Sequence, residues 1–145
     1  MSTQAVASFE NVNLNEIDPA GMKMPVGTPF NFRIASADLR QYSNDKGSGE
    51  YTLFKFTVID DPKFTGRTFY KSLFADKSDA KKPYTAIQLR KLMDCTGVPQ
   101  EGGYTEWLAD LVTNAATFSA PLEDRKQKDG TMRAEPNLFQ TAPAN

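Results

Sequence analysis

Aromatic and cationic side chains alternate along two neighbouring segments in the first half of the chain. Tyr51 and Lys55 share one face of an alternating run, and Arg67, Phe69 and Lys71 recur at two-residue spacing in the next run. Aromatic rings can stack on nucleic-acid bases, while lysine and arginine can contact phosphates. Because every base offers a π-face, such stacking needs no particular base. The pattern therefore predicts a surface suited to single-stranded nucleic acid, read without sequence preference.

The second of these segments allows two face assignments. The favoured one turns Phe69 and its alternating neighbours outward. The other turns Thr68, Tyr70, Ser72 and Phe74 outward, makes Tyr70 the stacking platform and places Phe69 in the core. A slip of one residue exchanges the two sets, because successive side chains of a strand point to opposite faces. Both Phe69 and Tyr70 therefore remain candidates for base stacking.

Further cations lie where they can extend this surface. Arg33 and Arg40 belong to the alternating run that precedes the other two, and would lengthen the basic track. Two hydrophilic, glycine-containing segments, 43–49 and 124–130, suit loops that clamp phosphates. The basic residues of these two segments are Lys46, Arg125, Lys126 and Lys128.

The residue types that most catalytic sites need are missing or isolated. The chain has no histidine and one cysteine, which excludes Ser/His/Asp and Cys/His nucleophile pairs and zinc sites built from histidine and cysteine. Asp60 and Asp61 are adjacent, so on a strand they would point to opposite faces and make poor joint metal ligands. We interpret Asp60-Asp61-Pro62 as a turn. We expect no enzymatic activity, no cofactor and no bound metal.

The charge balance limits how a basic surface can work. Lysine and arginine number 17 against 18 aspartates and glutamates, which gives a formal net charge of -1 and a pI of about 5.5. Attraction of the whole molecule to a polyanion is therefore not expected, and binding has to come from segregated local patches.

The cellular compartment follows from the cysteine and from hydropathy. Cys95 lies in an apolar-periodic run with Leu89 and Leu92, which indicates a buried, inert thiol and a reducing compartment. The sequence offers neither a targeting segment nor an apolar run long enough to cross a membrane. We expect a cytoplasmic protein without a membrane partner.

Periodicity and turn residues predict a mainly β chain. Three strands, 28–42, 50–60 and 67–76, are expected to form an antiparallel meander. A helix over 83–97 follows, and a second, short helix is expected after an N-cap at Thr105, burying Trp107, Leu108, Leu111 and Val112. A closing hairpin is expected from strands 116–123 and 131–141.

This element order is that of the OB-fold, a five-stranded, partly open antiparallel barrel that binds ligands across strands 2 and 3 between two loops. The predicted OB-fold domain covers residues 28–140. An N-terminal arm, 1–27, can add one edge strand through Phe9, Val12 and Leu14, and residues 141–145 are expected to form a loose tail.

From residue 28 to 139 the chain resembles small bacteriophage-encoded single-stranded-DNA-binding proteins of the replication and recombination region. The stretches that carry the resemblance are PVGTPFNFRI, EYTLFKFTVIDDPKFTGRTFYKSLF, AIQLRKLMDCTGVP and EDRKQKDGTMRAEPNLF. The resemblance implies an OB-fold that coats single strands in phage replication, recombination or repair, in the host cytoplasm. It implies phosphate contacts from Lys55, Arg67 and Lys71, stacking by Tyr51 and by Phe69 or Tyr70, and flaps formed by the two basic loops.

The sequence departs from this family at one point and leaves other readings open. Many members end in an acidic tail that recruits phage or host replication and recombination enzymes, whereas this sequence ends NLFQTAPAN, so such partner contacts would lie elsewhere. The main alternative is an all-β interaction module, such as a virion component, that assembles without nucleic acid. An oligosaccharide-binding OB-fold is a third reading. Oligomeric state stays open, a homo-oligomer included.

Overall fold

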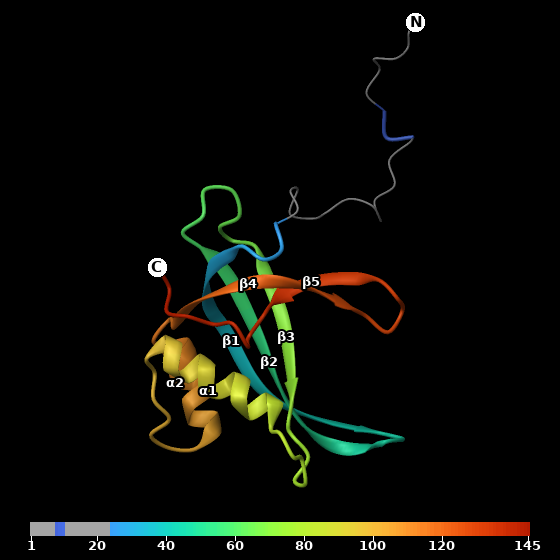
Figure 1. The fold of residues 1–145 in the computed structure, drawn as a ribbon, viewed down its shortest axis with the longest axis vertical. Coiled ribbons are helices and arrows are strands. Elements are labelled where there is room, and N and C mark those ends of the chain that lie inside the picture. Colours follow the sequence, from blue (N-terminus) through green and yellow to red (C-terminus); the bar gives the residue numbers. More distant parts are fainter. Residues whose placement is uncertain (1–7, 11–23) are drawn as a thin grey trace, which may run out of the picture.

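The computed structural model describes residues 8–10 and 24–145, and these form a curved antiparallel sheet with two helices (Figure 1). The strands are β1 (Pro29–Asn44), β2 (Gly47–Ile59), β3 (Thr68–Phe74), β4 (Thr117–Lys126) and β5 (Met132–Pro136). The helices α1 (Tyr84–Thr96) and α2 (Tyr104–Thr113) lie between β3 and β4 in the chain. All five strands belong to one sheet, in the order β3-β2-β1-β4-β5. The expected mainly β class is confirmed at this level.

The core follows from the alternation seen in the sequence. Phe30, Phe32 and Ile34 of β1 are buried, as is every second residue of β2 from Thr52 to Val58. Phe118 of β4 stacks on Phe32 at a centroid distance of 5.4 Å. Aromatic side chains bury large apolar areas, so this row of phenylalanines supplies much of the hydrophobic stabilisation. We call the face of β1, β2 and β3 that carries this row the inner face, and the opposite one the outer face.

A β-bulge interrupts β1 at Ala35. Ile34 pairs with Phe56, but the next residue to pair is Ser36, opposite Lys55. The extra residue shifts the alternation by one position, so even-numbered residues of β1 turn outward after the bulge. Arg33 and Arg40, which strict alternation would place on opposite faces, consequently both lie on the outer face.

The register of β3 corrects the favoured face assignment. Phe69, Lys71 and Leu73 pair with residues of the buried row of β2, so they lie on the inner face. Lys71 and Leu73 are buried, and Phe69 packs against the core. Tyr70 and Phe74 turn outward, with exposed fractions of 48% and 52%. The prediction that Phe69 and Lys71 point outward is therefore wrong, and the alternative register is the one observed.

An ion pair links β3 and β5, the two edge strands of the sheet. The ammonium of Lys71 on β3 lies 3.2 Å from a carboxylate oxygen of Glu135 on β5, and the Lys71 side chain is only 1% exposed. Arg125 on β4 contacts the other oxygen of Glu135 at 3.3 Å. β3 and β5 are not hydrogen-bonded neighbours in the sheet, so it is not closed into a barrel by a continuous ladder. Glu135 thus holds the two edge strands together through charge.

The predicted long helix is confirmed as α1. It begins directly after Pro83 and ends at Gly97, whose φ of 73° lies in the left-handed region and whose N–H bonds to the carbonyl of Met93. Proline before the first turn and glycine after the last are the expected start and stop signals of a helix.

The second helix, α2, starts two residues earlier than predicted. Gly103, rather than Thr105, is its N-cap, and Asn114 is its C-cap. Trp107, Leu108 and Leu111 are buried as predicted, whereas Val112 is 37% exposed. The indole N–H of Trp107 donates to the carbonyl of Val98 at 2.8 Å, which ties α2 to the end of α1.

The C-terminal tail differs from its prediction. The tail after Phe139, expected to be loose, is bound to the sheet: Ala142 and Ser119 exchange two backbone hydrogen bonds, and Asn145 exchanges two with the side chain of Asn31. Most of the N-terminal arm, including Val12 and Leu14 of its suggested edge strand, lies outside the described residues.

Within 8–10 and 24–145, neither helix has the length and apolar character that crossing a membrane requires.

Candidate functional site

The outer face of β1, β2 and β3 presents its side chains in ordered rows. Cross-strand pairing places Ser36, Lys55 and Tyr70 in one row and Arg40, Tyr51 and Phe74 in another. Directly opposed side chains of neighbouring strands lie close enough to interact. Aromatic and cationic groups that are scattered in the sequence therefore form one surface, which we call the outer-face surface.

Lys55 and Tyr70 form a cation–π pair in this surface. The ammonium of Lys55 lies 5.9 Å from the centroid of the Tyr70 ring, within the range of such attraction. The Tyr70 side chain is 48% exposed, so much of the ring still faces solvent. A planar base that stacked there would lie beside a positive charge able to contact its phosphate.

Three aromatic rings cluster at the end of the outer-face surface nearest the β1–β2 turn. Tyr51 and Phe74 lie 5.2 Å apart between ring centroids, and Tyr42 contacts both, at 6.4 Å and 5.4 Å respectively. Tyr42 also covers Gly49 on β2, where an added Cβ would stand 2.9 Å from the tyrosine hydroxyl. Mutual contact holds these rings in place, and Phe74 remains 52% exposed.

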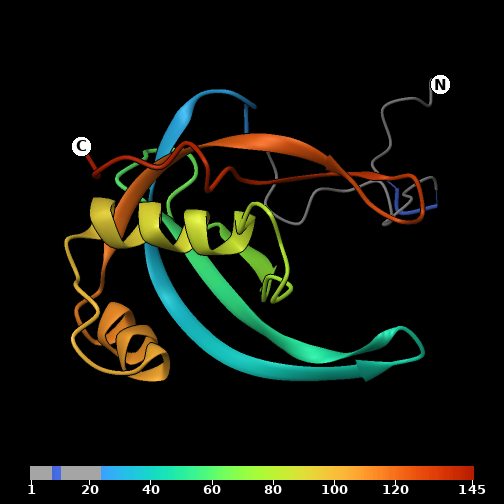
Figure 2. The same cartoon turned by 60° about the horizontal axis from the view of Figure 1, so that its bottom comes forward.

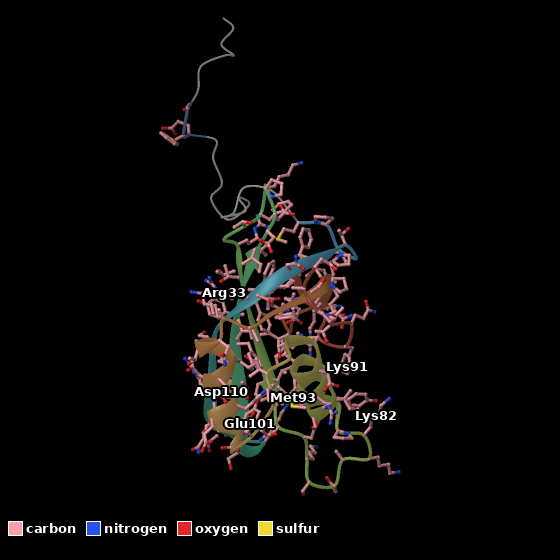
Figure 3. The ribbon with its side chains drawn as sticks, turned by 90° about the vertical axis from the view of Figure 1, so that its left-hand side faces the viewer. Arg33, Lys82, Lys91, Met93, Glu101 and Asp110 are labelled. Carbon is pink, nitrogen blue, oxygen red and sulfur yellow. The ribbon has the colours of Figure 1, made fainter. Side chains whose placement is uncertain are left out.

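Arg33 and Arg40 flank the aromatic residues. Arg40 stands directly opposite Tyr51, and Arg33 stands opposite Thr57, two residues beyond Lys55 on the same face. Both arginines are exposed, and Figure 3 shows Arg33 pointing away from the ribbon. Asp38 shares this face, so its carboxylate offsets part of the positive charge. Both arginines predicted to extend the basic track therefore lie on the outer face.

The other members of the predicted track are placed elsewhere. Arg67 precedes β3, and its guanidinium lies 5.5 Å from the ring centroid of Phe64 in the β2–β3 connection. Phe69 lies 6.0 Å from the core ring Phe32 between centroids, and Lys71 pairs with Glu135. Phe69 and Lys71 therefore stabilise the inner face, and neither belongs to the outer-face surface.

The first predicted flap is a strand extension instead of a loop. β1 and β2 pair up to Asn44 and Gly47, which leaves only Asp45 and Lys46 as the turn. Gly47 adopts a φ of 135°, and the N–H of Lys46 bonds to the Asn44 side chain at 2.9 Å. A two-residue connection of this kind is the tightest hairpin turn. Lys46 is thus an exposed cation at the tip of a long two-stranded arm.

The second predicted flap is a hairpin too, and one of its cations, Arg125, is paired with a carboxylate. Asp124, Arg125 and Lys126 belong to β4 rather than to a loop, and the turn is confined to residues 127–131. Arg125 is held by Glu135, whereas Lys126 and Lys128 are exposed. Both hairpins extend to the same side of the molecule, with β3 between them (Figure 2). A strand bound beside β3 would therefore lie within reach of both.

The carboxylates Asp60 and Asp61 form a turn, as predicted. The side chain of Asp61 accepts hydrogen bonds from the N–H groups of Lys63 and Phe64, both at 2.9 Å. Asp60 adopts a φ of 58°, typical of a tight reversal. Within the described ranges, no group of three or more histidine, cysteine, aspartate or glutamate side chains could hold a metal ion.

A hollow elsewhere in the described part of the chain offers little chemistry. It has a volume of about 330 Å³ and lies between the end of α1 and the connection from α2 to β4. Its lining consists of Thr96, Gly97, Val98, Pro99, Asn114, Ala115, Ala116 and Thr117. None of these side chains is an acid or a base, so the hollow cannot support proton transfer.

Three pKa shifts have clear physical causes. Burial raises the pKa of the Cys95 thiol, which keeps it protonated and a weak nucleophile. Burial also raises the pKa of Tyr104, against the opposing effect of a 2.6 Å hydrogen bond with Thr52. Hydrogen bonds from Thr131 lower the pKa of Asp129 in the β4–β5 turn. None of these groups belongs to the outer-face surface.

Sequence reasoning missed two members of the aromatic cluster. Tyr42 was not singled out, and Phe74 entered only through the alternative register. The signal was present in the sequence: Asp45-Lys46 followed by glycine suits a two-residue turn, and counting outward from it pairs Tyr42 with Gly49 and Arg40 with Tyr51. We predicted a longer loop, 43–49, and therefore did not consider this pairing of β1 with β2.

Comparison with known proteins does not assign the chain to a family. No protein-family model matches the chain, and no curated protein matches it significantly in sequence.

Proposed function

We propose that this chain binds single-stranded DNA without sequence preference, through the outer-face surface, and performs no catalysis. The observation that carries the proposal is the Lys55–Tyr70 pair: an exposed ring with a cation 5.9 Å from its centroid, on the same face of the sheet as a cluster of further rings. Stacking contributes about 1–3 kcal/mol per base in proteins that bind single strands. Exposed Arg33 and Arg40 on the same face supply further phosphate contacts.

We also propose that the architecture is an OB-fold. In support, a curved five-stranded antiparallel sheet has its helices inserted between β3 and β4, and the Lys71–Glu135 pair brings β3 and β5 together. OB-folds bind oligonucleotides across strands 2 and 3, between the β1–β2 and β4–β5 connections. In this chain that region is the outer-face surface, with Lys46, Lys126 and Lys128 on the two hairpins. Protection of single strands in phage replication, recombination or repair, in the host cytoplasm, is the biological role that fits.

The proposal is tested by fluorescence anisotropy. A labelled oligothymidine of about 30 nucleotides, longer than one OB-fold occupies, is titrated with protein at several salt concentrations. We expect tight binding whose logarithm falls with the logarithm of salt concentration at a slope of about -3 to -4, because each neutralised phosphate contributes about -0.7. The matching duplex and an RNA of the same sequence serve as comparison ligands. A slope near zero, or no binding at low salt, would refute the proposal.

A specific observation also favours a second candidate function. Phe74 is 52% exposed, next to Tyr42 and Tyr51, and exposed aromatic clusters are typical of protein–protein interfaces. In that case the chain is an assembly module, such as a virion component, and Phe74 lies in a contact between copies. Light scattering of the protein alone distinguishes the two. A defined oligomer that Phe74→Ala dissociates, together with no binding of oligothymidine, would support the assembly module.

A further inference from the structure

A second lysine-covered tyrosine lies away from the outer-face surface. The ammonium of Lys82 is 5.4 Å from the ring centroid of Tyr84, close to the 5.9 Å of the Lys55–Tyr70 pair. Tyr84 is 56% exposed, and the 41% exposed Phe139 meets its ring edge-on at 6.2 Å between centroids. The described part of the chain therefore carries a second pair of a lysine and an exposed tyrosine ring, and here an exposed phenylalanine lies beside the tyrosine. We call this second one the helix-end surface.

The helix-end surface combines two segments that are distant in the sequence. Tyr84 is the first residue of α1, and Phe139 follows β5. In Figure 3, Lys82 and Lys91 lie on the side of the molecule opposite to Arg33. The surface is therefore separate from the part of the outer face that carries Arg33.

A direct contact nevertheless joins the two surfaces. The hydroxyl of Thr85 donates to the carbonyl oxygen of Phe74 at 2.6 Å, which fastens the start of α1 to the end of β3. Because consecutive Cα atoms are about 3.8 Å apart, the backbones of Phe74 and Tyr84 lie within roughly 11 Å of each other. A strand that leaves the outer face over Phe74 reaches the start of α1 next.

The lysines around the helix-end surface favour a phosphate group as its ligand. The segment before α1 carries the exposed lysines Lys77, Lys81 and Lys82. Of its two acids, Asp76 accepts hydrogen bonds from two N–H groups in the first turn of α1, those of Thr85 and Ala86, both at 3.0 Å. Asp76 thus occupies the helix N-terminus, so the lysines, not the helix dipole, are the groups left to attract a phosphate.

We propose that the helix-end surface is a second contact for single-stranded DNA, which continues the strand beyond the outer-face surface. The inference rests on the proposed function. Tyr84 and Phe139 supply stacking faces, and Lys82, with its lysine neighbours, supplies phosphate contacts. Long strands then engage both surfaces, and short ones only the outer face with its larger set of rings.

The test compares strand lengths in the double variant Tyr84→Ala/Phe139→Ala. Oligothymidines of about 8 and about 30 nucleotides are titrated, one within and one beyond the usual span of an OB-fold. We expect the affinity for the short strand to stay unchanged and that for the long strand to fall by about 5-fold or more, because stacking is lost. The number of nucleotides covered per protein should fall as well. Val112→Ala, a similarly exposed position on α2, is the matched control.

Each outcome separates the inference from the proposed function. If the wild-type protein binds neither strand, the proposed function fails and the inference with it. If the wild-type protein binds both strands and the variant matches Val112→Ala at both lengths, the inference is wrong and the proposed function stands; docking of a protein on this surface would give that result. An equal loss at both lengths also overturns the inference. Should the double variant fail to fold, Lys82→Glu replaces it, with the same selective loss on the long strand expected.

Discussion

Lys55 and Lys71 lie on neighbouring strands, β2 and β3, but on opposite faces of the sheet. Lys55 is on the outer face, over the ring of Tyr70. Lys71 is on the inner face, 1% exposed, and its ammonium contacts Glu135 at 3.2 Å. The sequence motif placed both on one basic track, yet their surroundings assign them to different tasks.

The difference shows what a lysine in an alternating strand can mean. A lysine on the outer face, such as the partly buried Lys55, contributes little to stability and remains available to a ligand. A buried lysine has lost its hydration, and only a well-placed opposite charge compensates for that loss. Residue type and spacing are the same for Lys55 and Lys71, so the group that each lysine contacts determines whether it stabilises the fold or remains available for binding. The predictions below separate the inner face, which should control stability, from the outer face, which should control binding.

The largest effect is expected from Lys71→Ala. Removing one partner of a buried ion pair costs about 3–5 kcal/mol, because the remaining charge stays buried. Glu135 keeps Arg125, so we expect a loss of unfolding free energy at the lower end of this range. Urea denaturation followed by circular dichroism measures it.

A matched variant tests the cause of this loss. Lys71→Met/Glu135→Gln removes both charges and keeps most of the volume, so its stability should return toward that of the wild type. Lys55→Ala should leave the unfolding free energy within about 0.5 kcal/mol, as is usual for surface positions. Equal destabilisation by Lys55→Ala and Lys71→Ala would contradict the assignment of the two faces.

The next largest effect concerns Tyr70 on the outer face. Tyr70→Ala should lower the affinity for oligothymidine by about 5- to 150-fold, which corresponds to the loss of one stacked base at about 1–3 kcal/mol. Its unfolding free energy should change little, because half of the side chain is already in solvent. Anisotropy titration and urea denaturation of the same preparation give both values.

Two control variants show whether the effect of Tyr70→Ala comes from the loss of the aromatic ring. Tyr70→Phe keeps the stacking face and should bind nearly as the wild type does. Met132→Ala, which removes another exposed apolar side chain, on β5, should have no comparable effect. If Tyr70→Ala bound oligothymidine like the wild type, Tyr70 would not be a stacking platform.

The sequence was sufficient for the order of the strands and insufficient for the faces of β3 and for the ends of some strands: the last was expected over 131–141 and is β5, Met132–Pro136. In β1 and β2 one row is strongly apolar and the other mixed, so Phe32 and Phe54 could be assigned to the core. In β3 both rows contain aromatic residues, and the inner row contains Lys71. Only Glu135, far along the chain, makes that lysine acceptable inside, and no local pattern shows such a partner.

The candidate site was predictable in kind but not in detail. Tyr51 and Lys55 were identified correctly as outer-face residues from alternation alone, whereas on β3 the favoured Phe69 was wrong and the alternative, Tyr70, is the outer-face ring. The bulge at Ala35 has no distinctive sequence signal, yet it decides that Arg40 joins Arg33 on that face. The length of the β1–β2 turn decided whether Tyr42 belonged to the surface. Both features depend on how neighbouring strands pair, which a single strand's pattern does not reveal.

A smaller effect is expected from Tyr104→Phe, which tests the inner face without charge. The hydroxyls of Tyr104 and the buried Thr52 share a hydrogen bond of 2.6 Å, and a phenylalanine ring has no hydroxyl with which to form it. We expect a loss of about 1–2 kcal/mol of unfolding free energy, because the Thr52 hydroxyl is left unpaired. Affinity for oligothymidine should not change.

The same variant predicts a pH dependence. Burial raises the pKa of Tyr104 in the folded state above that of an unfolded tyrosine, about 10. As pH rises past the unfolded value, the unfolded state loses its proton first, so this contribution to stability falls until the pH passes the folded pKa. Urea midpoints between neutral and alkaline pH should therefore drop more steeply for the wild type than for Tyr104→Phe. Parallel curves would mean that Tyr104 does not titrate differently on folding.

The smallest effects are expected from single arginines at the margins of the outer face. Arg33→Ala and Arg40→Ala should each make the salt slope less steep by about 0.7, the value for one phosphate contact on a single strand. Arg90→Ala on α1 removes an arginine that is paired with Asp94, and should leave the slope unchanged. Because the bulge at Ala35 places both arginines on one face, their effects should add in the double variant. If only one of the two changed the slope, the strand would cross just one end of the outer face, and the other arginine would lie beyond its path.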